Sequence, residues 1–211
     1  MAIGKMTDFI VSERVPVSPC LIRGCLCVCI SPPPSLSCRA SKGADVKRVL
    51  ITGMSGTGKS TVTAELAARG YNAVDTDYGG LSEVVRVPHD QQTGLGRGQD
   101  WVWREDRIQV LLSATDTNLL FLAGCAPNQG KFYPWFDHII LLSAPAHVIV
   151  ERLTTRTNNP YGSSPEDITR TLDLLQTIEP LLRRGAGHEV DTSVPLDQVV
   201  TRVLQIVGEQ T

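Results

Sequence analysis

Hydrophobic positions between residues 47 and 211 fall into two alternating patterns. Short runs rich in apolar residues predict strands at 48–52, 72–75, 119–124, 137–142 and 188–191. Between them, apolar residues at helical spacing or a helix-starting residue predict helices at 60–69, 103–114, 145–156 and 165–184, the last bent or ended locally by Pro180. A one-sided apolar stripe predicts a final helix through Leu196, Val199, Val200, Val203, Leu204 and Val207.

This alternation of strands and helices predicts an α/β fold with a parallel sheet covered on both faces. Two segments interrupt the pattern. Residues 78–100 are rich in glycine, contain Pro88 and hold one short apolar patch at 81–87, so we expect a long functional or mobile loop. Residues 158–162 form a turn-rich break, after which Ser164 is expected to cap the next helix.

Residues 1–46 differ in composition from the remaining chain. Five of the six cysteines lie there, in a spacing that matches no paired zinc motif, together with three consecutive prolines. We interpret this part as a disordered extension, or as sequence upstream of the true start, with a targeting peptide or a metal-binding tail as alternatives. Residues 47–211 are then expected to form one domain.

Charge and hydropathy exclude two classes of protein. The net charge is −2, with about +4 carried by residues 1–48 and −6 by the rest, so the domain has no basic footprint for nucleic acid. No apolar run approaches the length of a membrane span. We therefore expect a cytoplasmic protein, a monomer or weak homodimer, whose partner is a small molecule.

A glycine-rich motif directly follows the first predicted strand. Residues 53–60, Gly-Met-Ser-Gly-Thr-Gly-Lys-Ser, fit G-x-x-x-x-G-K-[ST], with a strand before and a helix after. Backbone N–H groups of such a loop surround phosphate oxygens, and the helix N-terminus adds positive charge. The motif assigns ATP binding to Gly53, Ser55, Gly56, Thr57, Gly58, Lys59, Ser60 and Thr61, with Ser60 on Mg²⁺.

Two pairs of charged residues are candidates for the chemistry. Asp75 and Asp77 end the second strand, where α/β sheets bind ligands, so one could order Mg²⁺ and the other accept a proton. Their alternative role is turn formation. Arg152 and Arg156 lie four residues apart before the break, where they could stabilise charge on a transferred phosphoryl group; their alternative is a solvated basic patch.

Residues 47–208 resemble the small P-loop kinases of the shikimate, gluconate and nucleoside-monophosphate kinase group. Val74 to Asp77 is similar to the Asp-x-Asp of shikimate kinases, and Trp103-Arg104 to their aromatic-Arg substrate clamp. Arg152 and Arg156 resemble lid-flanking arginines, and residues 190–195 the adenine-side edge. The resemblance implies a three-layer P-loop NTPase fold with a five-stranded parallel sheet and a short lid at 158–162.

The loop after the third main strand departs from that group. Shikimate kinases carry Gly-Gly-Gly there, whereas this chain has Gly124 followed by Cys-Ala-Pro-Asn-Gln-Gly, and the Asp-Gly-x-Pro-Arg of adenylate kinases is also missing. Because this loop helps to hold substrate in the family, Gly124 becomes a candidate substrate-binding residue together with Asp77 and Arg104. The alternative for Arg104 is a helix start at which Trp101 and Trp103 pack.

Two hypotheses follow from these motifs. The first is an ATP- and Mg²⁺-dependent kinase of a small hydroxylated or phosphorylated metabolite. Its catalytic residues would be Lys59, Asp75, Asp77 and Arg156, with Arg152 binding ATP and with Ser60 and Asp75 on the metal. The alternative is a nucleotide-binding regulator or slow ATPase without a small acceptor, favoured by the unusual loop after Gly124.

Overall fold

The computed structural model describes residues 46–88, 98–157, 161–162 and 164–209. The extension predicted at residues 1–46 lies outside this part, except for its last residue, the buried Val46. Most of the lid expected at 158–162 lies outside it as well. Both therefore stay predictions.

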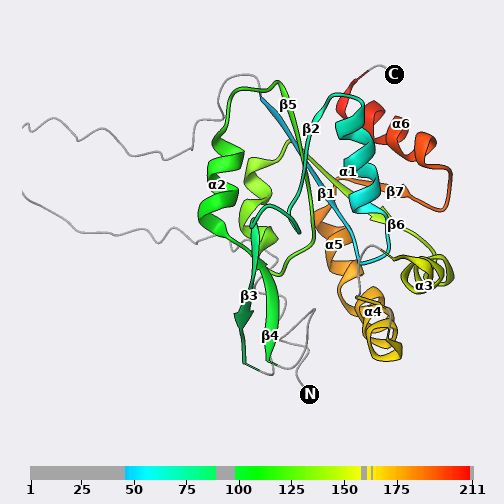
Figure 1. Ribbon diagram of the computed structural model, residues 1–211. Helices are drawn as coiled ribbons and strands as arrows, with labels where there is room; N and C mark the ends of the chain where they lie inside the picture. The colour runs from blue at the N-terminus through cyan, green and yellow to red at the C-terminus, as the bar shows by residue number, and fades with distance from the viewer. Residues whose placement is uncertain (1–45, 89–97, 158–160, 163, 210–211) are drawn as a thin grey trace, which may run out of the picture.

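The predicted five-stranded parallel sheet is confirmed (Figure 1). Its strand order is β2-β5-β1-β6-β7, and every neighbouring pair is parallel. The strands are β1 (Lys47–Thr52), β2 (Asn72–Asp75), β5 (Leu119–Ala123), β6 (His138–Ser143) and β7 (His188–Asp191). Because β5 lies between β1 and β2, the strand that ends in Asp75 does not adjoin the strand that precedes the glycine loop.

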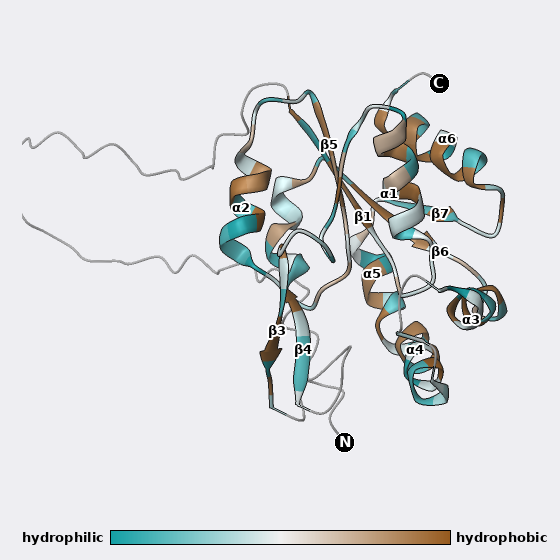
Figure 2. Ribbon diagram, viewed as in Figure 1, coloured by the Kyte–Doolittle hydropathy of each residue, from teal (hydrophilic) through white to brown (hydrophobic). Residues whose placement is uncertain are grey.

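Helices cover both faces of the sheet, which explains why its central strands are apolar almost throughout. Val49 and Ile51 pack with α1 (Lys59–Ala68) and α6 (Leu196–Val207), whereas Leu50 packs with α2 (Glu105–Ser113) and the 3₁₀ helix η2 (Gln129–Trp135). Successive residues of a strand face opposite ways, so β1 contributes to two apolar layers. Figure 2 shows these central strands in brown between the helices.

An antiparallel hairpin replaces part of the loop predicted at 78–100. β3 (Ser82–Arg86) pairs with β4 (Gln99–Trp103), and Val84 lies opposite Trp101. The two strands are far apart in sequence, so no local turn signal predicted their pairing. In Figure 1 this hairpin extends away from the main sheet, below α2.

The helices differ from the predictions mainly at prolines. The predicted helix 165–184 is two helices, α4 (Pro165–Thr177) and α5 (Glu179–Gly185), because Pro180 cannot continue a helix and starts a new one. The preceding helix, α3, spans Ala146–Thr155. Ser164 caps α4 as expected, its Oγ accepting the Asp167 N–H at 3.2 Å.

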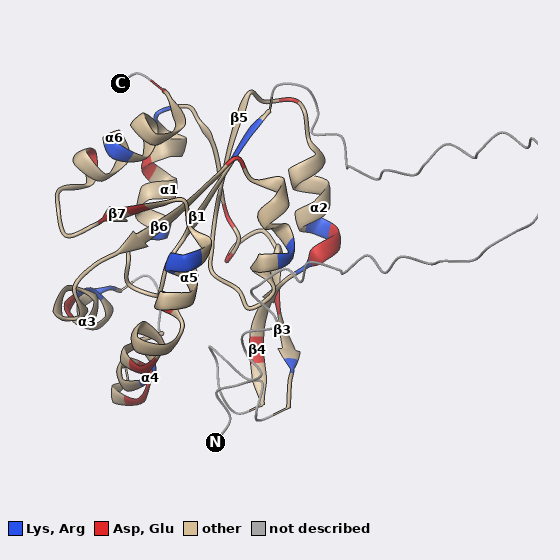
Figure 3. Cartoon of the chain, turned by 180° about the vertical axis from the view of Figure 1, so that it is seen from behind, with Lys and Arg blue, Asp and Glu red and all other residues tan. Residues whose placement is uncertain are grey.

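Acidic and basic residues are interspersed over the helices. In Figure 3, α2, α4, α5 and α6 each carry both signs. None of the helices in the described ranges combines the length and the apolar character that a membrane crossing needs.

Candidate active site

The glycine loop joins β1 to α1 in a backbone conformation that only glycine adopts easily. Gly53 has φ +151°, and a Cβ on it would lie 2.4 Å from the Leu142 carbonyl oxygen. Gly56 and Gly58 have φ of +86° and +89°. Gly58 precedes α1 without a side-chain cap, so the first N–H groups of the helix are available to an anion.

Two side chains of the loop bond to its own backbone. The Thr57 hydroxyl is fully buried and donates to the Met54 carbonyl at 2.8 Å. The Lys59 ammonium donates to the carbonyls of Gly53 and Met54 at 2.8 and 3.1 Å. Thr57 therefore stabilises the turn, whereas Lys59 is curled over the loop, where its Nζ can exchange a carbonyl for a phosphate oxygen.

The two arginines of the α3 end both bond to backbone groups around the loop. Arg152 donates to the Gly56 carbonyl at 3.4 Å and to the Thr192 hydroxyl and carbonyl at 3.0 and 2.5 Å. Arg156 donates to the Tyr161 carbonyl and to Ser55 Oγ, the latter at 3.5 Å. Burial lowers the pKa of the Arg156 guanidinium, and nearby tyrosines and Asp167 oppose this shift.

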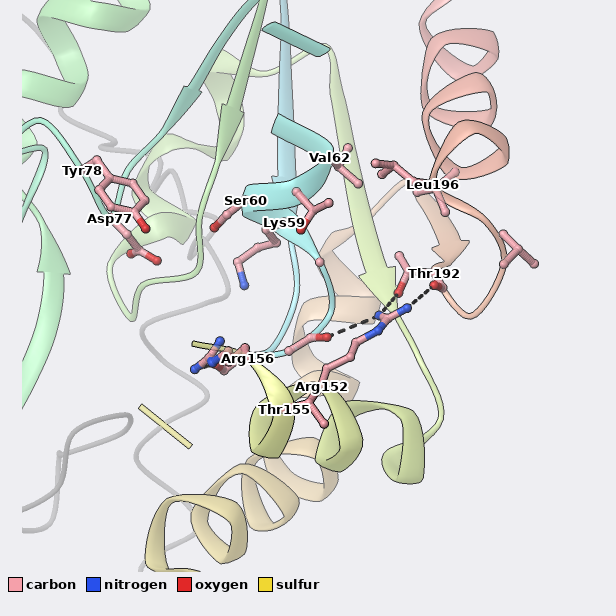
Figure 4. Close-up of a pocket in the computed structure, with 16 residues that line it drawn as sticks. Lys59, Ser60, Val62, Asp77, Tyr78, Arg152, Thr155, Arg156, Thr192 and Leu196 are labelled. Carbon is pink, nitrogen blue, oxygen red and sulfur yellow. Dashed lines mark hydrogen bonds between the residues drawn. The ribbon is translucent and has the colours of Figure 1, made fainter. Parts of the chain in front are cut away.

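A cavity of about 450 Å³ brings many of the predicted residues together. Figure 4 shows Asp77 and Tyr78 at one end, Thr192 and Leu196 at the other, and Lys59 and Ser60 between them. Of the predicted site residues, those lining it are Ser55, Gly56, Gly58, Lys59, Ser60, Thr61, Asp77, Arg152 and Arg156.

The two aspartates differ in position. β2 ends at Asp75 and the chain turns, so the two carboxylates do not project alike as they would on a continuing strand. Asp75 Oδ1 accepts the Asp77 N–H at 3.0 Å, and its Oδ2 is buried without a hydrogen-bond partner among the described groups. Asp77 is exposed and lines the cavity. Asp75 therefore stabilises the turn, and Asp77 faces the cavity.

Arg104 and Gly124 do not line this cavity. Arg104 precedes α2, and its guanidinium lies 3.5 Å from the Asp106 carboxylate. Gly124 is packed against the segment after β2, since a Cβ on it would lie 2.0 Å from Thr76 Oγ1. Gly53 and Thr57 are also absent from the lining and shape the loop from behind.

Sequence reasoning missed the roles of Tyr78 and Trp101 at this cavity, whereas Val194 lies in the predicted adenine-side edge at 190–195. Tyr78, 59% exposed, lines the cavity beside Asp77, and Val194 lines its other end. Trp101 of β4 donates its indole N–H to Asp77 Oδ1 at 3.0 Å. The sequence shows that Tyr78 follows Asp77. The contact between Trp101 and Asp77 depends on the β3–β4 hairpin.

Comparison with known proteins shows the family to which the chain belongs. The sequence profile of a family described as an AAA domain matches residues 49–173, from β1 into α4 and more than half of the chain. The chain belongs to this AAA-domain family. The resemblance to P-loop kinases is also confirmed by Shikimate kinase 2 of Yersinia enterocolitica, which is 25% identical over 168 residues, covering 77% of this chain and 96% of that protein.

Solved structures show the same fold. The shikimate kinase from Acinetobacter baumannii, in complex with shikimate, is 20% identical with a TM-score of 0.52, covering 80% of this chain and 95% of that chain. The shikimate kinase from Bacteroides thetaiotaomicron is 15% identical with a TM-score of 0.50, covering 77% and 98%. The chain therefore has the fold of the small P-loop kinases.

Proposed function

We propose that this protein is an ATP-dependent phosphotransferase acting on a small hydroxylated or phosphorylated metabolite. One observation carries the proposal: a single cavity holds the loop lysine, two arginines and an exposed carboxylate at one end. A site that only bound a nucleotide would not need Asp77 beside the phosphates, whereas phosphoryl transfer needs a group to receive the proton of the attacking hydroxyl.

The nucleotide is expected to lie along the cavity with its base at the Thr192, Val194 and Leu196 end, here called the nucleotide end. Loop N–H groups and the start of α1 would hold the β- and γ-phosphates. Arg152 supports this end by joining Gly56 to Thr192, so loop and base site keep a fixed spacing. Lys59 would leave its carbonyl partners for the phosphates.

The residues present fit a magnesium ion. The Ser60 hydroxyl lines the cavity, whereas Asp75, whose Oδ2 is a buried oxygen without a protein partner among the described groups, lies outside the lining and would reach the ion only through a water molecule. Within the described residues no group of three or more His, Cys, Asp or Glu could hold a metal, but Mg²⁺ in phosphate sites needs only one or two protein carboxylates. When bound, the ion would neutralise charge on the phosphates.

The acceptor is expected to bind at the Asp77 and Tyr78 end, here called the acceptor end. Asp77 would take the proton of the acceptor hydroxyl. The hydroxyl oxygen would bond to the γ-phosphorus as the bond between that phosphorus and ADP breaks. Arg156 lies near Ser55 and the Tyr161 carbonyl, where it would stabilise charge on the transferred group. Arg104 and the loop that starts at Gly124 would contact the acceptor from just outside the cavity.

The remaining features of the proposal are a cytoplasmic location, a monomer or weak homodimer, and no nucleic-acid partner. The even mixing of charges over the helices supports a small partner rather than a polyanion.

Steady-state turnover tests the proposal. ADP release from MgATP would be measured with and without shikimate, gluconate, neutral sugars and nucleoside monophosphates, with ³¹P NMR to identify the product. We expect one acceptor class to accelerate release and gain phosphate. The Asp77→Asn variant should lose this acceleration and retain MgATP affinity, whereas Asp173→Asn, an exposed aspartate on α4, should behave as wild type.

Two outcomes would contradict the proposal. ADP release that ignores every acceptor would favour the regulator or slow ATPase. Calorimetry that detects no MgATP or MgGTP binding would remove the nucleotide assignment as well.

A further inference from the structure

The acceptor end depends on a contact from outside the cavity. Trp101 Nε1 donates to Asp77 Oδ1 at 3.0 Å, although Trp101 is not among the residues that line the cavity. An indole nitrogen can only donate and an ionised carboxylate can only accept, so the direction of this bond is unambiguous. The contact joins residues from two segments 24 positions apart.

The hairpin that carries Trp101 is anchored to the same turn by further bonds. Trp103, two residues along β4 and on the same face, donates its indole N–H to Thr76 Oγ1 at 3.0 Å. Ser82 of β3 donates its hydroxyl to the Thr76 carbonyl at 2.8 Å. The turn that contains Asp77 is thus held by the hairpin from three positions.

The other side of the hairpin is fixed as well. The Asn128 side chain accepts the Trp103 N–H at 3.0 Å and donates to the Trp103 carbonyl at 2.9 Å. Asn128 is buried and belongs to the loop that follows β5. Since one edge of β4 pairs with β3 and the other is bonded to Asn128 at Trp103, Trp101 has a defined position relative to Asp77.

We propose that Trp101 is a positioning residue for phosphoryl transfer, which it serves by fixing the orientation of the Asp77 carboxylate. This inference rests on the proposed function. Asp77 is exposed and lies in a turn, so its carboxylate would otherwise rotate. With Oδ1 held by the indole, Oδ2 is the oxygen left for the acceptor hydroxyl. A misplaced catalytic group lowers the rate steeply, so fixing this orientation contributes directly to kcat.

Trp101→Phe removes the donor and keeps an aromatic ring. A hydrogen bond to a charged group corresponds to roughly a tenfold to hundredfold effect, so we expect kcat to fall about tenfold or more while the acceptor KM changes little. Trp135→Phe is the matched control, since Trp135 ends η2 and no hydrogen bond joins its indole to the turn of Asp77 among the described residues. An unchanged kcat in Trp101→Phe would overturn the inference.

A double-mutant cycle separates positioning from a general loosening of the hairpin. If Trp101 acts through the carboxylate, Trp101→Phe on the Asp77→Asn background should change the residual rate by no more than about twofold. A full additional loss on that background, together with a raised KM, would show that Trp101 acts only by supporting the hairpin, and would contradict the inference.

An indole NMR experiment is independent of the acceptor. In the ¹⁵N-labelled full chain, Asp77→Asn should shift the indole N–H signal of Trp101, assigned with Trp101→Phe, and leave that of Trp135 unchanged. A Trp101 signal indifferent to Asp77→Asn would overturn the positioning inference even if the protein is a kinase. If that signal shifts but no acceptor is phosphorylated, the contact exists and the proposed function is wrong.

Discussion

The phosphate loop and the acceptor end of the cavity are formed by different kinds of chemical group. The phosphate loop consists largely of main chain: positive-φ glycines, the start of α1, and a carbonyl bonded to Arg152. The acceptor end consists of side chains, Asp77 and Tyr78, whose position depends on Trp101 in a separate hairpin. We therefore expect substitutions in the phosphate loop to be poorly tolerated. Substitutions in the hairpin, by contrast, could alter which acceptor the site binds.

Lys59→Ala should give the largest loss of kcat, because it removes the cationic side chain of the phosphate loop. Removing a preorganised cationic donor from a transfer site costs about a hundredfold to a thousandfold in kcat. Because Lys59 bonds only to carbonyls of its own loop, the melting temperature should stay within about 2 °C. Arg69→Ala at the other end of α1 is the control. Activity retained by Lys59→Ala would contradict a role for this lysine in transfer.

Gly53→Ala should damage the loop itself. The added Cβ meets the Leu142 carbonyl at 2.4 Å and φ is +151°, so we expect a cost of about 1–3 kcal/mol and a melting temperature roughly 3–10 °C lower. Nucleotide affinity should fall as well, as calorimetry would measure. Gly70→Ala also has positive φ but meets open space, so it should lower stability less and leave nucleotide affinity unchanged.

A crossed pair of substitutions separates the two ends. Tyr78→Ala should raise the acceptor KM by about twofold to tenfold and leave the ATP KM unchanged, because it removes an aromatic wall beside Asp77. Val194→Ala should do the opposite, raising the ATP KM about twofold to threefold. Steady-state kinetics with each substrate varied in turn measures both. If the same KM rises in both variants, the assignment of the ends is wrong.

The smallest expected effect concerns a surface pair that joins α2 to η2 beside the hairpin. Lys131 lies 2.6 Å from Glu105, and this bond holds the pKa of the Glu105 carboxyl below its usual value. A depressed carboxyl pKa stabilises the fold above the unfolded pKa of about 4.3, and this contribution is lost as pH falls through the lower folded value. Since both groups are exposed, the pair contributes only about 0.2–1 kcal/mol.

Lys131→Gln should therefore lower the melting temperature slightly at pH 7 and have no effect near pH 2. Thermal unfolding in low salt measures the difference, and added salt should reduce it. A deficit that persists unchanged at pH 2 would show that Lys131 stabilises the fold by packing rather than through this pair.

The sequence predicted the features that depend on nearby residues and missed those that depend on distant ones. The sheet and the phosphate loop were predictable because each depends on nearby residues: an apolar run makes β1, and Gly53 to Ser60 lie in one segment. β3 and β4 were not, because Val84 and Trp101 pair across a long connection without turn signals. Pro180 marked the end of a helix, but not that a second helix would begin there.

The candidate site shows the same limit at the level of single residues. Lys59, Ser60, Arg152 and Arg156 were placed by local spacing, and all four line the cavity. Asp75 and Asp77 were predicted together, yet the turn after β2 sends only Asp77 into it. Trp101 carried no local signal, since its role arises only when the hairpin packs on that turn.

The central position of β1 has a consequence for synthesis of the chain. Among the described strands β1 is synthesised first, but its two hydrogen-bonding neighbours, β5 and β6, follow only at residues 119–143. Until then, its apolar residues and both of its edges lack their native partners, a state in which nascent proteins are prone to aggregate. The centre of the sheet can therefore form only after β6 has been made.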